Sequence, residues 1–327
     1  SELVFSTSAD GAESPTARVT INSSGDLIIN STGGTLQTAT AGTSNFRVGV
    51  NAGNSITSGG NYNNFVGDEA GTAVTTGDGN TAMGFEALST ETGGNQSVAI
   101  GHKALRVQNN TDTNYNTAVG AQAGLSVTTG IRNTFIGGIA GDALTDADNN
   151  VAVGYKALSA DTLGTGSVAI GSNALQDQNF STATTTYNVA VGLNAGLDIT
   201  TGVQNTLIGG LAGDNLTVGN FNVAVGYNAL TDDVLGSRTT AIGHNALANQ
   251  YFTTATDSYN TAVGQAAGLS VTTGIKNVLL GSRNGDALTE GGNNIAIGDS
   301  ALSSDTLGSK SVAIGDSALY NQNFTTA

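Results

Sequence analysis

Aromatic side chains gather in three polar loops of the sequence, at residues 108–115, 178–187 and 250–259. An aromatic ring can stack on the face of a sugar, while the neighbouring Asn, Gln and Thr side chains hydrogen-bond to its hydroxyl groups. The loops therefore hold the candidate receptor or glycan contacts. The alternative is that the same rings pack between chains or cover the edge of the fold. The candidate contact residues are Tyr115, Phe180, Tyr187, Tyr251, Phe252 and Tyr259.

The acidic residues offer the second kind of chemistry. Hydrolysis of a glycan needs two carboxyl groups at one site. Here the acids are scattered over the segments expected to be turns, and Asp232-Asp233 corresponds to Ala160-Asp161 one repeat earlier. We interpret this difference as variation on a solvated turn, so we expect no catalytic residues and no enzyme.

Metal and phosphate sites are also unsupported by the pattern. His102 and His244 occupy equivalent positions, but the other two equivalents are Ser172 and Asp316, which is typical of a polar surface column. The run at 142–148 resembles a calcium loop only superficially, because the spacing, glycine and glutamate of that motif are missing. Paired glycines such as those at 137–138 are not followed by the Lys-Ser/Thr of a phosphate-binding loop. We expect no metal and no cofactor.

A repeat organises all of these residues. A glycine that closes each x-Ala-Val-Gly unit recurs sixteen times, mostly at every seventeenth position, and the equivalent glycines at 120, 192 and 264 define a larger unit of four coils. A fixed period of this length predicts a solenoid. We therefore expect an all-β parallel solenoid (β-roll) of about sixteen 17-residue coils, grouped in fours, with the three polar loops as insertions in every fourth coil. The glycines are at 49, 67, 84, 101, 120, 137, 154, 171, 192, 209, 226, 243, 264, 281, 298 and 315.

The residues around this glycine predict the faces of each coil. The residue before it is aliphatic or Met in all sixteen coils, and the one before that is Ala in eleven. Neighbouring residues of a strand face opposite ways. We expect each coil to hold two short strands around a thin core, with the Ala face packed against other copies of the chain and Asn and Thr ladders running along the stack. At about 4.8 Å a coil, the rod would be roughly 75 Å long.

Residues 1–44 do not carry the repeat and are expected to form an N-terminal β cap and connector before the repeat domain at 45–327. Segments 3–7, 17–22 and 27–30 read as strands, with a turn at 23–26 and a connector from Gly33 to Ser44. The chain begins with Ser1 rather than Met and stops inside an inserted loop, so we expect a processed chain or fragment that continues past Ala327. A net charge of −15 disfavours nucleic acid and anionic membranes as partners.

Three units carry a resemblance to known families: 97–105, 150–158 and 311–319, each of the form x-Val-Ala-Ile/Val-Gly-x-x-Ala-Leu. They resemble repeats of bacteriophage tail fibre proteins and are similar to the heads of trimeric autotransporter adhesins. The segment from Ala17 to Leu27 resembles a module that often precedes such repeats in phage fibres. The resemblance implies a homotrimeric fibre on a virion, outside the cell, which joins other virion tail proteins and contacts a host cell-surface glycan or protein receptor. The alternatives are a bacterial surface adhesin head and a glycan-depolymerising tailspike.

Overall fold

The computed structural model describes residues 3–7, 16–21, 27–29 and 41–326. Near the N-terminus it contains three antiparallel strands, β1 (Leu3–Thr7), β2 (Thr16–Ile21) and β3 (Leu27–Ile29), close to the predicted segments. The turn expected at 23–26 and most of the connector expected at 33–44 lie outside the described residues. The described part contains no helix, so no helix in it could cross a membrane.

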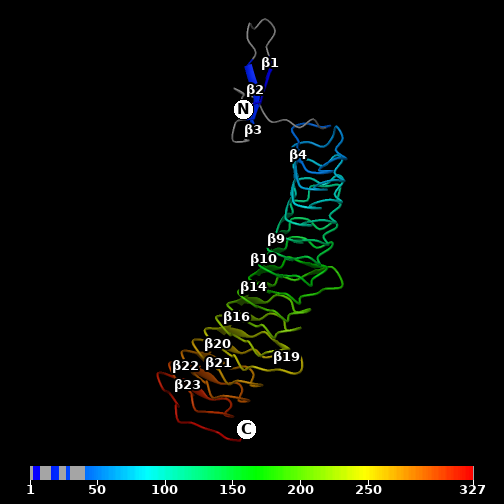
Figure 1. The fold of residues 1–327 in the computed structure, drawn as a ribbon. Helices are drawn as coiled ribbons and strands as arrows, with labels where there is room; N and C mark the ends of the chain where they lie inside the picture. The colour runs from blue at the N-terminus through cyan, green and yellow to red at the C-terminus, as the bar shows by residue number, and fades with distance from the viewer. Residues whose placement is uncertain (1–2, 8–15, 22–26, 30–40, 327) are drawn as a thin grey trace.

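The rest of the described chain is a stack of coils, each contributing one three-residue strand to a sixteen-stranded parallel sheet (Figure 1). Every strand pairs in register with the next along the chain, such as Ala118 with Phe135 and Phe135 with Ala152. The prediction of a parallel solenoid of about sixteen coils is confirmed. The strands are β4 (Phe46–Val48), β5 (Asn64–Val66), β6 (Thr81–Met83), β7 (Val98–Ile100), β8 (Thr117–Val119), β9 (Thr134–Ile136), β10 (Val151–Val153), β12 (Val168–Ile170), β14 (Val189–Val191), β15 (Thr206–Ile208), β16 (Val223–Val225), β18 (Thr240–Ile242), β20 (Thr261–Val263), β21 (Val278–Leu280), β22 (Ile295–Ile297) and β23 (Val312–Ile314).

The prediction of two strands in every coil is wrong for the described residues. Among the described residues, a second, two-residue strand pair forms only between two of the inserted loops and the coil before each, as β11 (Gly164–Thr165) with β13 (Thr184–Thr185) and β17 (Gly236–Ser237) with β19 (Thr256–Asp257). The first loop makes a single parallel bridge there, between Asn95 and Thr113. Elsewhere the coils are linked by single backbone hydrogen bonds between equivalent turn residues, such as Thr128 N–H to Thr145 O at 3.0 Å. These turns contain many residues with positive φ, which is incompatible with an extended strand. The backbone hydrogen bonds between coils form without a strand.

The sheet faces are the reverse of what we predicted. The strand-centre column, which is the middle residue of each strand, is buried in fifteen of sixteen coils, and its alanines lie inside the coil's own core. The strand-end column, which is the aliphatic residue before the repeat glycine, is nowhere buried; Ile136 is 41% exposed and Ile314 66%. The Ala face therefore does not pack against another chain. The aliphatic column is the surface that remains available to a partner.

Large and small residues alternate between two core positions, the strand centre and the residue four after the repeat glycine, so that together they fill the narrow core. In the first two coils of a four-coil unit the residue four after the repeat glycine is glycine, and a Cβ at Gly124 or Gly141 would lie 2.7 or 2.4 Å from the ring of Phe135. In the last two coils that position is leucine, as at Leu158, and the strand-centre residue returns to alanine. One large side chain thus occupies the space that two leucines fill elsewhere.

A ladder of buried asparagines holds the coils in register, as predicted. Asn205 donates from Nδ2 to the carbonyl oxygen of Gly219 in its own coil at 2.9 Å, and its Oδ1 accepts the N–H of Asn222 in the next coil at 2.9 Å. The same two bonds recur along the stack, for example at Asn133. Each side chain therefore closes its own coil and fixes the next one.

Close approach of the coils explains the repeat glycine. Gly137 has φ +134°, and a Cβ on it would lie 2.5 Å from the carbonyl oxygen of Gly154 in the next coil. Only glycine leaves room for this contact.

Candidate functional site

The inserted loops begin at a buried acid–glutamine pair that the sequence analysis missed. Asp233 is fully buried, and its Oδ2 accepts a 2.6 Å hydrogen bond from Nε2 of Gln250, the first residue of the third loop. Its Oδ1 accepts the backbone N–H groups of Gly236 at 3.1 Å and Phe252 at 3.3 Å. The acid therefore fixes both its own turn and the start of the loop one coil later.

Gln250 connects this acid to the asparagine ladder. Its Nε2 also donates to Oγ1 of Thr239 at 3.0 Å, and its Oε1 accepts from Nδ2 of Asn260 at 2.8 Å. Thr239 stands where most coils have the ladder asparagine. The glutamine side chain thus takes over part of that asparagine's hydrogen bonding in the coil that carries the insertion.

The same anchor recurs in all four repeat units. The acid accepts from a glutamine one coil later in the pairs Glu91–Gln108, Asp161–Gln178, Asp233–Gln250 and Asp305–Gln322. This constant separation of the acid and the glutamine was the available signal in the sequence. Our interpretation of Asp161 and Asp233 as part of solvated turns is wrong, because both carboxyl groups are fully buried.

Burial raises the pKa of Asp161 and Asp233. Desolvation raises the pKa of Asp161 above its ordinary value, and the hydrogen bond from Gln178 together with those from the backbone of Phe180 and Gly164 opposes the rise. Burial raises the pKa of Asp233 in the same way, against the bonds from Gln250, Phe252 and Gly236. Charged groups out of contact with water are stable only when fully hydrogen-bonded, which is the condition that the anchor meets.

Two of the candidate contact residues serve the anchor rather than the surface. Phe180 and Phe252 are 6% and 5% exposed, and Oγ1 of Thr162 donates to the carbonyl oxygen of Phe180 at 2.8 Å. Their rings cover the edge of the solenoid, which was the alternative considered for the loop aromatics. They leave no ring face for a ligand in this conformation.

The other four candidate residues, Tyr115, Tyr187, Tyr251 and Tyr259, are exposed. Tyr115, Tyr187 and Tyr259 each have φ +51° and stand immediately before a buried ladder asparagine. They lie one four-coil unit apart along the rod, so the structure spaces them rather than bringing them into one site.

The third loop is further tied to its neighbours through Arg238. The guanidinium lies 4.7 Å from the ring centre of Phe221 and 6.0 Å from that of Tyr259, and Nε contacts Oδ2 of Asp257 at 3.2 Å. Arg238 is thus sandwiched between two aromatic rings of adjacent coils.

The histidines lie on the surface, as expected. His102 stacks on Phe85 and His244 on Tyr227, with ring centres 5.7 and 5.8 Å apart. Within the described ranges, no group of three or more His, Asp or Glu side chains could hold a metal ion.

Comparisons with known proteins identify no relative of the chain. Models of known protein families, characterised proteins and solved structures were searched, and none of them matches this sequence or its fold.

Proposed function

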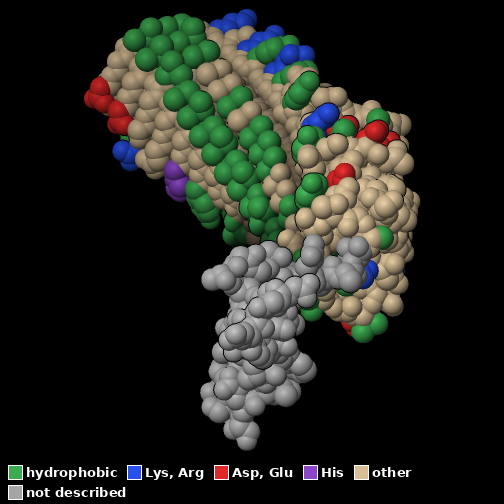
Figure 2. Space-filling view, turned by 90° about the horizontal axis from the view of Figure 1, so that it is seen from above, with side chains coloured by type: hydrophobic (Ala, Val, Ile, Leu, Met, Phe, Trp, Pro, Cys, Tyr) green, Lys and Arg blue, Asp and Glu red, His purple; other side chains and the backbone are tan. Residues whose placement is uncertain are grey.

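We propose that this chain is a rigid segment of a bacteriophage tail fibre, assembled as a homotrimer outside the cell and used for attachment to a host. The observation that carries the proposal is the strand-end column. It forms a row of sixteen aliphatic or Met side chains, half of them exposed and the others partly exposed. Figure 2 shows hydrophobic side chains in long rows along one face of the rod.

An exposed apolar row of this length is expected to be buried against another protein surface. Single soluble chains rarely expose continuous apolar patches beyond a few hundred square ångströms. A parallel copy of the same chain presents the same row at the same coil spacing, so side chains can match along the whole length. Three copies around one axis follow from the resemblance to trimeric fibres, and closed symmetry is the usual state of such assemblies.

The inserted loops supply the attachment surface in this proposal. Tyr187 is 63% exposed beside Thr and Asn side chains, and its equivalents Tyr115 and Tyr259 repeat along the rod. Three chains would multiply these sites threefold. Weak contacts to a host glycan or protein receptor then combine through avidity, and a rigid stack holds them at fixed distances.

The assembly is tested by mass. The chain of 32.4 kDa should elute from size exclusion with light scattering at three times that mass. Replacing Ile136, Ile170 and Ile208 with Asp should convert it to a folded monomer, because charges cannot be buried in the row. Replacing the exposed polar residues Gln204 and Lys276 with Asp is the matched control and should leave the mass unchanged. A monomeric wild type at micromolar concentration would refute the trimer.

The attachment role is tested on cells. The trimer should adsorb to host bacteria, and Tyr187→Ala combined with Tyr115→Ala and Tyr259→Ala should reduce adsorption. A bacterial adhesin head, the first alternative, would share the trimer and be produced on the bacterial surface. A depolymerase would instead release reducing ends from host polysaccharide.

A further inference from the structure

A second surface column runs beside the sheet, at the turn that leads into each strand. We call it the corner column: the residue immediately before the buried ladder Asn, Ser or Thr of each coil. Its non-glycine members have φ near +58°, as at Tyr62, Gln96 and Arg132. Arg238 belongs to this column, and its sandwich between Phe221 and Tyr259 shows that a planar group fits between rings on neighbouring coils.

One rung of the column is open at Gly79. A Cβ built there would meet only Cγ of Gln96, at 3.6 Å. The flanking rungs, Tyr62 and Gln96, are two coils apart, roughly 10 Å at the usual strand spacing. The space between these two residues is therefore wide enough for one ring of a ligand, in the position where Gly79 has no side chain. At the other glycine rung, Gly166, a Cβ would meet Tyr187 at 3.9 Å and Thr185 at 4.0 Å, both in the second inserted loop, and Gly166 does not line the notch described next.

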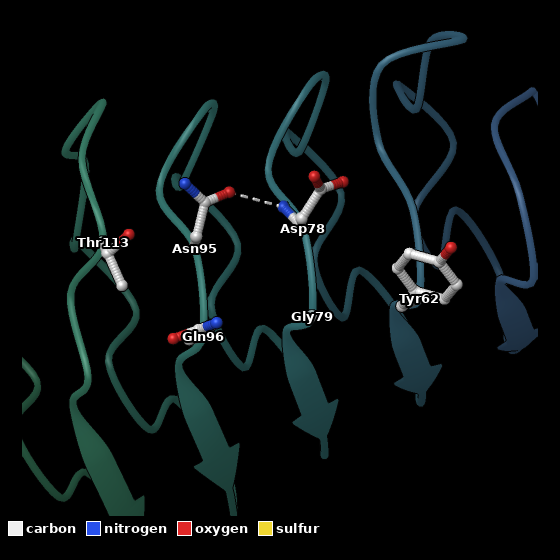
Figure 3. Close-up of a pocket in the computed structure, with 6 residues that line it drawn as sticks. All are labelled: Tyr62, Asp78, Gly79, Asn95, Gln96 and Thr113. Atoms are coloured by element: carbon white, nitrogen blue, oxygen red, sulfur yellow. Dashed lines mark hydrogen bonds between the residues drawn. The ribbon is translucent and has the colours of Figure 1, made fainter.

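The open rung is the floor of a notch of about 370 Å³, lined by six residues on four successive coils (Figure 3). Tyr62, 66% exposed, forms one wall and Gln96 the opposite side. Asp78 and Asn95 line the notch from the position before each corner residue, and Thr113 lies at its far end.

Asp78 and Asn95 each use one polar side-chain atom within the protein and leave the other available to a ligand. Oδ1 of Asp78 accepts the N–H of Asn61 at 2.6 Å, and Oδ1 of Asn95 accepts the N–H of Asp78 at 2.7 Å. These bonds orient both side chains. They leave the second carboxylate oxygen of Asp78 as an acceptor and the Nδ2 of Asn95 as a donor, without a protein partner among the described residues.

We propose that this notch binds one neutral hexopyranose ring of a glycan. The ring takes the missing rung, with its C–H face against Tyr62 and its hydroxyl groups hydrogen-bonded to Asp78, Asn95 and Gln96. A carboxylate beside amide groups suits a sugar's paired hydroxyls, and the absence of Lys and Arg from the lining disfavours an anionic sugar. The site rests on the proposed attachment function, but it is separate from the inserted-loop tyrosines.

Saturation-transfer NMR tests the notch with the methyl glycosides of glucose, galactose, mannose and N-acetylglucosamine. At least one should receive saturation at its ring C–H protons from the wild-type trimer. Tyr62→Ala should weaken its binding at least about tenfold, or about 1.4 kcal/mol. Gly79→Asn should abolish it by filling the rung, and it should fold normally because asparagine tolerates the φ of +67° at this position.

Gln204→Ala, in the same column far from the notch, is the matched control and should bind like wild type. Binding that survives both notch variants overturns the inference. If such binding is lost in Tyr187→Ala instead, the attachment function stands without the notch. A wild type that binds none of the four glycosides also overturns the inference, and cell adsorption then decides the attachment function separately.

Discussion

Reversing the polarity of one buried hydrogen bond should loosen one inserted loop and leave the rest of the rod intact. Asp233→Asn keeps the shape of the side chain but turns its Oδ2 into an amide donor. That donor faces Nε2 of Gln250 across 2.6 Å. The glutamine cannot simply flip, because its Oε1 already accepts from Asn260. The variant therefore places two buried donors against each other.

The magnitude follows from the two lost partners. An unsatisfied buried donor costs about 1–3 kcal/mol, so the local loss should be about 2–4 kcal/mol after relaxation. This corresponds to a roughly 30- to 1,000-fold larger opening constant. Because each coil contacts only its neighbours, the effect should stay near the third loop.

A second substitution should rescue the first. In Asp233→Asn with Gln250→Glu, the amide introduced by the first substitution is the donor. The carboxylate introduced by the second accepts from it, from Oγ1 of Thr239 and from Nδ2 of Asn260. The bonds of Gln250 to residue 233 and to Thr239 are then present with their direction reversed. The bonds from Asn260 and from the backbone of Gly236 and Phe252 keep their direction.

Hydrogen exchange measured by mass spectrometry is the assay. Amides at 250–259 should exchange faster in Asp233→Asn and regain protection in the double variant, while those of the equivalent loop at 178–187 serve as the internal control. Unchanged protection at 250–259 in the single variant would refute the anchor. Equal loss in both loops would refute the local coupling.

Two further predictions use the core and the titration of the anchor. Phe135→Ala should lower the free energy of unfolding by about 3–5 kcal/mol, because it leaves a cavity. Adding Gly141→Leu should recover part of this loss, since Leu158 holds the equivalent position at φ +54° and Gly141 has φ +58°. Urea denaturation measures both variants, and a double variant less stable than the single one would contradict the exchange of large and small residues. Burial raises the folded-state pKa of Asp161 above its ordinary 3.8, so the folded chain binds more protons than the unfolded chain between those two values. Its stability contribution is therefore largest below pH 3.8 and is lost as pH rises through the folded pKa. Exchange at 178–187, corrected for intrinsic rates, should be slower in acid, and Asp161→Asn should remove that dependence.

The spacing of residues was enough to predict the coil count, the strand positions and their register. A repeat of constant length fixes which residues stack, and Asn205 above Asn222 in the ladder follows directly from it. The face of the strand could not be predicted from alternation, which separates Ala118 from Val119 but does not say which is inside. The inside is decided by volume, because the narrow coil takes alanine at most strand centres and its bulk from leucines in the turn, while a large strand centre such as Phe135 is matched by glycines in the turn.

The buried acids show a second limit. Asp161 and Asp233 lie in turns, where an acid is ordinarily solvated. Their burial depends on a partner one coil away, so no local property of the turn reveals it. Only the pairing of the acid with a glutamine at the same place in the next coil, in all four units, distinguishes them from surface acids such as Asp232.

The anchor also explains how loops of different length coexist in one stack. The first insertion adds two residues to the 17-residue coil and the next two add four each, yet the acid, the glutamine and the backbone N–H two residues after it make the same bonds in every unit. On the far side, the strand resumes after an exposed tyrosine with the same φ of +51°. Both ends of the insertion are therefore fixed by the coil, and in the second and third loops the short strands β13 and β19 add a further link to the preceding coil. A loop held in this way is free to change its length and surface chemistry, while the rod beneath it keeps its register.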